Sequence, residues 1–195
     1  MKRLSVLLAV ALLTGCAAQP EAPGGTEAPT STPVAFDEEL HDELLAMLER
    51  DQAGRTGGVD NEGDQARTNR LKEILDEHGW PTFDLVGEDG EDAAWAIAQH
   101  SDLQPQVQAE ALALLEVAVE RGQASPGNLA YLTDRVAVGA GKQQSYGTQV
   151  GCGPNGPEPA TPIKDADNVE ARRAAADLES LADYLEEMAA ICAED

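Results

Sequence analysis

The sequence has few basic and few aromatic residues, and both shortages limit what the protein can do. It contains 13 Lys and Arg against 36 Asp and Glu, which gives a formal net charge of -23 at pH 7. A surface of this sign repels nucleic acid backbones and anionic lipid headgroups. We therefore expect no nucleic acid partner and no basic membrane-binding patch. Aromatic residues make up only 4% of the chain, so the core must consist mainly of small aliphatic side chains.

Motifs typical of catalytic and metal sites are also missing. No two of the histidines, His41, His78 and His100, are three or four residues apart, and no cysteine pair has the spacing of metal ligands. The sequence contains neither a Gly-x-Ser-x-Gly motif nor a glycine-rich phosphate loop. It therefore predicts no metal site and no cofactor, and it offers no recognisable nucleophile.

The amino-terminal residues indicate export. Lys2 and Arg3 precede an apolar run that is too short to cross a bilayer. The run ends in Leu13-Thr14-Gly15-Cys16, which resembles the lipobox of bacterial lipoproteins. We expect the Cys16 thiol to carry a diacylglycerol and the new amino terminus an acyl chain such as palmitate, which together anchor a protein durably. The alternative is an ordinary secretory signal in which the cysteine is incidental.

Composition divides the chain into three parts. Residues 1–15 are expected to be the lipoprotein signal peptide, and residues 16–34 to be the lipidated cysteine and a flexible linker without large apolar residues. The lipid would be the only membrane attachment, on the outer face of a bacterial membrane, at the cell surface or in the periplasm. Residues 35–195 form a domain of about 160 residues, which is long enough to bury a core.

Apolar residues of this domain recur at helical spacing, so we predict an all-α, single compact domain of five or six helices. A short irregular or extended segment is expected near residues 143–150, with no obvious strand partner, before a proline-rich stretch at 154–162. The helices are expected near residues 36–56, 64–78, 91–99, 102–121, 125–138 and 169–192. Asp102 and Ser125 are the predicted N-caps of the fourth and fifth helices, and residues 79–90 are predicted to be a loop.

Two cysteines remain after Cys16, and two readings of them are open. Cys152 and Cys192 can form one disulfide, because such bridges persist outside the cytoplasm. The bridge would tie the segment near 143–150 to the last helix. Alternatively, Cys192 is a buried core residue, since it continues the helical spacing of Leu181, Leu185 and Met188.

Polar residues interrupt the apolar faces of several predicted helices. Asp51 and Arg55 continue the apolar stripe of the first helix, and His100 continues that of the third. The first two could instead be an exposed ion pair at a fraying helix end, and a single histidine on an apolar face is commonly a satisfied core residue. Asp134 and Arg135 interrupt the fifth helix in the same way.

Taken in order, these residues resemble a bacterial domain-of-unknown-function family, numbered six-six-two-four. The resemblance covers residues 36–184, and no activity, substrate or cofactor follows from it. It implies that the polar residues belong to one shared pattern. The lipobox, linker and two late cysteines depart from that pattern, which strengthens the disulfide reading. The matching motifs are Asp51-Gln52-x-x-Arg55, Gly79-Trp80-Pro81, Val86-Gly87, Gln99-His100-x-Asp102, Asp134-Arg135, Gln144-x-Tyr146-Gly147-Thr148-Gln149 and Arg172-Arg173.

We hypothesise that the polar residues converge on one pocket, because burying them apart would be costly. In one reading the pocket belongs to a surface-anchored binding or structural module for a polar extracellular ligand or protein partner. In a second, an extracytoplasmic, hydrolase-like enzyme uses His100 as acid or base, oriented by Asp102 or Asp134, with Arg55 or Arg135 stabilising negative charge. In a third, the cluster is only a buried network that fixes the fold. The candidate pocket residues are Asp51, Gln52, Arg55, Trp80, Gln99, His100, Asp134, Arg135, Gln144, Tyr146, Thr148 and Gln149.

Overall fold

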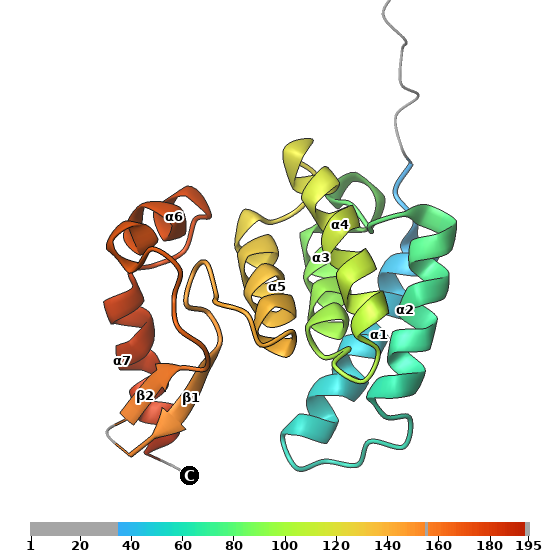
Figure 1. Cartoon of the computed structure of the whole chain (residues 1–195). Helices are drawn as coiled ribbons and strands as arrows, with labels where there is room; N and C mark the ends of the chain where they lie inside the picture. Colours follow the sequence, from blue (N-terminus) through green and yellow to red (C-terminus); the bar gives the residue numbers. More distant parts are fainter. Residues whose placement is uncertain (1–34, 155, 194–195) are drawn as a thin grey trace, which may run out of the picture. The chain divides into compact units, whose positions relative to one another are not determined.

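The computed structural model describes residues 35–154 and 156–193, and this part of the chain is mostly helical (Figure 1). It holds seven α-helices and one two-stranded sheet, which confirms the all-α prediction. The expected signal peptide, Cys16 and linker lie outside the described residues. Within the described ranges, no helix combines the length and apolar content needed to span a membrane.

Five helices carry the main hydrophobic core: α1 (Glu38–Arg55), α2 (Asp64–His78), α3 (Phe83–Gln99), α4 (Pro105–Glu120) and α5 (Pro126–Gly139). Helix α1 packs along α3, and α4 packs along α5 (Figure 1). Leu44, Leu71, Ile97 and Leu115 are fully shielded from solvent at the centre. The spacing of these residues is the helical pattern seen in the sequence, so the core explains why these segments are helices.

Side-chain caps fix where some of these helices begin. Asp37 accepts a hydrogen bond from the Leu40 amide at α1, and Ser125 accepts one from the Asn128 amide at α5. The predicted cap of α4 is wrong, because Gln104 rather than Asp102 precedes this helix. Pro105 takes the first helical position, which suits its fixed φ. The Asp102 carboxylate instead accepts hydrogen bonds from side chains of α4 and α5.

The loop predicted at residues 79–90 is mostly helical. Helix α3 starts at Phe83, eight residues before the expected start near residue 91. Gly87, with φ 77° and ψ 172°, kinks it without ending it. Only a residue without a Cβ adopts this conformation readily. Gly87 and Gly90 therefore lie within the helix, whereas Gly79 ends α2.

Most of the segment predicted near 143–150 is irregular, and a strand with a partner begins only at its last residue, Val150. Strand β1 (Val150–Gly153) pairs antiparallel with β2 (Gly156–Pro159), with Val150 opposite Pro159. The partner lies inside the proline-rich stretch, where a two-stranded ribbon tolerates proline because one edge needs no donor. Residues 143–149, which come before β1, form only a single bridge, from Gln144 to Ile163.

The last predicted helix is two helices. A short 3-10 turn, η1 (Ala166–Asn168), leads into α6 (Val169–Ala175), and α7 (Leu181–Cys192) follows after a turn. Asp177 has φ 55° in this turn, and buried Arg173 donates from Nε to the carbonyl oxygen of Glu179 at 2.7 Å. Ser180 then caps α7. The break lets α7 fold back beside β1 and β2 (Figure 1).

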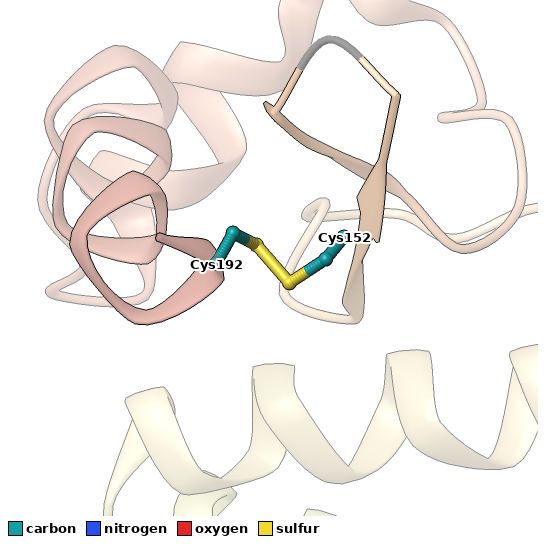
Figure 2. Close-up of a disulfide and its surroundings, with 2 residues drawn as sticks. All are labelled: Cys152 and Cys192. Carbon is teal, nitrogen blue, oxygen red and sulfur yellow. A yellow bond between two sulfur atoms is a disulfide. The ribbon is translucent and has the colours of Figure 1, made fainter. Parts of the chain in front are cut away.

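The predicted disulfide is confirmed. Cys152 on β1 and Cys192 at the end of α7 are bonded, and their Cα atoms are 5.4 Å apart (Figure 2). Cys192 is therefore not a free core thiol. The bridge holds the end of α7 against the strand that leads out of the residue 143–149 segment.

Candidate functional site

A pocket of about 370 Å³ lies where α3, α5 and α7 meet the residues that lead into β1. Residues from five parts of the chain line it, and most of their side chains are aromatic or uncharged polar. None is Asp, Glu, Lys or Arg. The lining residues are Gln52, Trp95, Ala96, Gln99, His100, Tyr131, Thr148, Gln149, Val150 and Tyr184.

Three aromatic residues form one connected wall of the pocket. The rings of Trp95 and Tyr131 meet edge to face at 5.9 Å between centroids, and those of Tyr131 and Tyr184 do so at 6.1 Å. The Tyr184 hydroxyl donates to the carbonyl oxygen of Thr148 at 2.8 Å. Burial raises the pKa of both Tyr131 and Tyr184, so neither phenol ionises near neutral pH. The wall is therefore uncharged.

Two residues that line this pocket each carry a buried polar atom without a partner. Nε1 of Trp95 and Oε1 of Gln99 are buried, and neither has a hydrogen-bond partner among residues 35–154 and 156–193. The two residues are four apart on α3, so their side chains lie on the same face of the helix. One is a donor and the other an acceptor. Groups of this kind are normally paired in folded proteins. Among the described residues, Nε of Arg67 and Nη2 of Arg173 are also buried and unpaired, but neither of these residues lines the pocket.

His100 is held by a carboxylate behind the pocket. Its Nδ1 lies 2.8 Å from Oδ2 of Asp51, whose side chain is 0% exposed. Burial lowers the pKa of His100, although the Asp51 charge acts in the opposite direction. The ring is thus neutral at pH 7. Because the Asp51 carboxylate can only accept, Nδ1 carries the proton, and Nε2 keeps a lone pair for a ligand.

The Asp51 carboxylate is itself fully engaged. Arg55 donates from Nε to Oδ2 at 3.0 Å and from Nη2 to Oδ1 at 2.9 Å, and Gln52 donates to Oδ2 at 2.9 Å. Buried Arg67 places its Nε 3.6 Å from Oδ1. The Asp51–Arg55 pair is therefore not the exposed, fraying pair of the alternative reading. The pair fixes the carboxylate that orients the His100 ring.

Asp134 shapes the other side of the pocket. Its buried carboxylate accepts from the amides of Ser145, Tyr146 and Thr148 at 2.6, 3.0 and 3.0 Å, and from the Thr148 hydroxyl at 3.1 Å. Gln144 adds a two-way contact, since its side chain donates to the Gln149 carbonyl and accepts from the Gln149 amide, both at 2.9 Å. Residues 144–149 are thus fixed by hydrogen bonds to side chains and not by pairing in a β-sheet.

Glycine is required inside this segment. Gly147 has φ 72°, and a Cβ at this position would lie 2.6 Å from Cδ1 of Ile163. Any other residue would strain the backbone and displace Ile163. The close approach lets residues 144–149 pack flat beneath the pocket.

The remaining predicted residues do not line the pocket. Arg135 donates from Nη1 to Oε1 of Gln149 at 3.1 Å and pairs with Asp102, so it supports the pocket from outside. Tyr146 contributes its backbone, and its side chain is not part of the lining. Trp80 lies in the core, where Nε1 donates to Glu91 at 3.1 Å. Asp102 and Asp134 were the predicted partners of His100. Both carboxylates bind other groups instead.

The structure thus brings together a subset of the predicted residues. Gln52, Gln99, His100, Thr148 and Gln149 line the pocket, while Asp51, Arg55, Asp134, Arg135 and Gln144 support it. Sequence reasoning missed the aromatic wall. Trp95 could have been found, since it shares a helix face with Gln99, but Tyr131 and Tyr184 carried no signal that separated them from core residues.

The chemistry open to this site is hydrogen bonding to an uncharged group, beside an imidazole that can accept a proton. Within the part of the chain that the structure describes, no three His, Cys, Asp or Glu side chains are grouped as metal ligands. The hydroxyl of Thr148 already donates to Asp134.

No curated protein and no solved structure matches this chain. One family model matches residues 38–192, which is nearly the whole of the helical domain. Its description states no activity and no ligand. The chain therefore belongs to the Family of unknown function (DUF6624).

Proposed function

We propose that this protein is an exported bacterial lipoprotein whose helical domain binds a small polar ligand in the pocket beside Trp95. The observation that supports binding most strongly is the unpaired Trp95 donor beside the unpaired Gln99 acceptor. Each unpaired buried group costs about 1–3 kcal/mol. A ligand that forms hydrogen bonds with both groups removes this cost. Water can form the same hydrogen bonds, but it does not select a particular ligand.

The surroundings of the pocket also support a binding role. Asp134 holds residues 145–148 through four hydrogen bonds, and Asp51 holds the His100 ring. A site that is already ordered loses little side-chain freedom when a ligand binds.

The two tryptophans allow a direct test of binding. In protein labelled with ¹⁵N, each indole N–H gives one signal, and Trp80 serves as an internal control because it lies in the core. We expect a screen of small neutral and charged polar compounds to yield one that shifts the Trp95 signal saturably and leaves that of Trp80 in place. Trp95→Phe assigns the signals. The binding proposal fails if every compound that binds shifts both signals equally or shifts neither.

Membrane attachment through Cys16 is a separate part of the proposal. It is supported by the apolar run that ends in Leu13-Thr14-Gly15-Cys16. We expect cells fed labelled palmitate to incorporate it into the wild-type protein, which then fractionates with membranes. Cys16→Ser should be unlabelled and released from the membrane, with Cys152→Ser as a control that keeps the label. Label retained in Cys16→Ser would contradict the lipid anchor.

The Asp51–His100 contact favours hydrolysis as a second candidate function. A neutral imidazole with Nδ1 held by a carboxylate can use Nε2 to take a proton from water. We would test this with panels of nitrophenyl esters and glycosides. Turnover that is lost in His100→Gln and kept in His78→Gln would support an enzyme, and the absence of any turnover by folded protein would favour binding alone.

A further inference from the structure

We infer that the pocket takes an uncharged acetamido sugar, that is, a hexosamine ring whose nitrogen is acetylated. This inference rests on the proposed binding function and adds the chemical class of the ligand. The charge of the pocket, its unpaired polar atoms, its aromatic wall and its size all favour such a ligand.

The pocket favours a neutral ligand. None of its lining residues is acidic or basic apart from His100, which is neutral at pH 7. The Asp51 carboxylate, which binds His100, is already paired with Arg55 and is not available to a ligand cation. The protein's net charge of -23 repels anions. A ligand with a full charge would find no partner for it.

The two unpaired atoms match one amide group. A secondary amide has one carbonyl acceptor and one N–H donor, which are the complements of Trp95 Nε1–H and Gln99 Oε1. A hydroxyl carries one donor and two lone pairs, so it can serve both atoms only where they lie within reach of a single oxygen. An amide supplies a separate donor and acceptor, whereas a quaternary ammonium can satisfy neither atom. Arg173 already lies 5.2 Å over the Tyr184 ring, so this face of the aromatic wall is taken by a cation of the protein itself.

The remaining open atoms suit hydroxyl groups. Gln52 uses Nε2 on Asp51 and keeps Oε1 free, and His100 keeps Nε2 free. Both are acceptors at the pocket lining, so the ligand must bring further donors, as sugar hydroxyls do. Of the aromatic wall, Trp95 and Tyr131 offer apolar surface for the C–H groups of a sugar ring and for the acetyl methyl group.

Size and form argue against a peptide. The volume of about 370 Å³ lies near the lower end of small-molecule pockets, which span about 300–1,000 Å³. Its open polar atoms belong to side chains, whereas peptides are commonly bound by adding a strand to a sheet edge. A single sugar unit is therefore the better fit.

The test is a titration of the ¹⁵N-labelled full-length protein with five probes. They are N-acetylglucosamine, glucose, glucosamine, choline and an N-acetylated dipeptide amide. We expect N-acetylglucosamine to shift the Trp95 indole signal saturably, and glucose and glucosamine to bind at least about tenfold more weakly. Loss of one neutral hydrogen bond corresponds to about this factor.

Variants locate the contact. Gln99→Leu should weaken N-acetylglucosamine binding about tenfold, and so should Trp95→Phe, which is followed through backbone amide signals because it lacks the Trp95 indole. Gln106→Leu, on the exposed side of α4, should leave binding unchanged. An unmoved Trp80 signal shows that each Gln99 variant is folded. If glucose binds as well as N-acetylglucosamine, or if choline or the dipeptide amide alone shifts Trp95, the acetamido sugar is wrong and the binding pocket stands. If no probe shifts Trp95 but the broad compound screen does, the sugar is again wrong. If neither does, both proposals are wrong.

Discussion

Nδ1 of His100, at the end of α3, lies 2.8 Å from Oδ2 of Asp51, in the last turns of α1. The two residues are 49 apart in the sequence, so this contact joins two helices as well as orienting one side chain. Because Asp51 also accepts from Arg55 and Gln52, the helix end and the pocket wall share one carboxylate. Stability and binding should therefore both respond to changes at Asp51.

Asp51→Asn should be destabilising. The change removes the buried anion that pairs with Arg55. Because Asp64 still pairs with Arg55, and Asp60 and Asp64 still pair with Arg67, the loss is that of hydrogen bonds to one buried charge, about 1.5–3 kcal/mol. Urea denaturation should show this loss in the free energy of unfolding. Glu49→Gln, on the exposed face of the same helix, should change it by less than about 0.5 kcal/mol. An Asp51 variant as stable as the Glu49 control would show that the network has no structural role.

His100 should make the protein less stable in acid. Its pKa is lowered in the folded state from the ordinary 6.5, so the unfolded chain takes up the proton first as pH falls. The free energy of unfolding should thus fall as pH drops below about 6.5. His100→Gln should remove this contribution, and His78→Gln, which changes an exposed histidine, should not. If the two variants show the same pH dependence, His100 does not titrate as the structure indicates.

Glu91 should act in the opposite sense. Burial raises its pKa from 4.5 to about 7, although Asn128 and Trp80 donate to it. Between these values the folded state holds the proton and the unfolded state does not. The Glu91 contribution to stability is therefore complete below about pH 4.5 and declines, by about 3 kcal/mol, as pH rises to about 7. Denaturation of Glu91→Gln across this range should lack this decline, whereas exposed Glu88→Gln should keep it.

Asp134→Asn should loosen the segment that carries Thr148 and Gln149. The carboxylate accepts from three backbone amides of residues 145–148, and an amide side chain can replace only part of this. Hydrogen exchange of these three amides should become at least tenfold faster, while core amides of α3 stay protected. Asp167→Asn is an exposed control. Unchanged exchange at all three positions would contradict the assigned role.

Reduction of the disulfide should release α7. The bridge spans 40 residues, and the chain-entropy model gives a loss of about 4 kcal/mol when it is removed. We expect Cys152→Ser with Cys192→Ser to lower the free energy of unfolding by about this amount. Because Tyr184 on α7 forms part of the pocket wall, the Trp95 indole signal should broaden as well. A sharp, unshifted signal would mean that α7 stays in place without the bridge.

The sequence predicted most helices because their apolar residues repeat at helical spacing, and it predicted the disulfide because only two cysteines follow Cys16. It failed at residues 83–90 and 176–180. At the first, Gly87 kinks a helix without ending it, and at the second, Asp177 takes a left-handed conformation that no glycine signals. Neither outcome follows from periodicity, since tertiary contacts decide both.

The candidate site was predicted in part for a similar reason. Polar residues on apolar faces stood out, so Asp51, Gln99, His100 and Asp134 were all identified. Their pairing was not, because which carboxylate meets His100 depends on how α1 crosses α3. Trp80 was included wrongly, since an indole with a buried partner and one without look the same in sequence.

The most direct test is a crystal structure of the protein purified from its own cells without added ligands, at a resolution that shows ordered water. Our account predicts one bound molecule that accepts from Trp95 Nε1 and donates to Gln99 Oε1, each at about 2.7–3.2 Å. It would be contradicted if the protein's own groups paired both atoms, or if soaking with the best compound of the screen left the pocket with water alone.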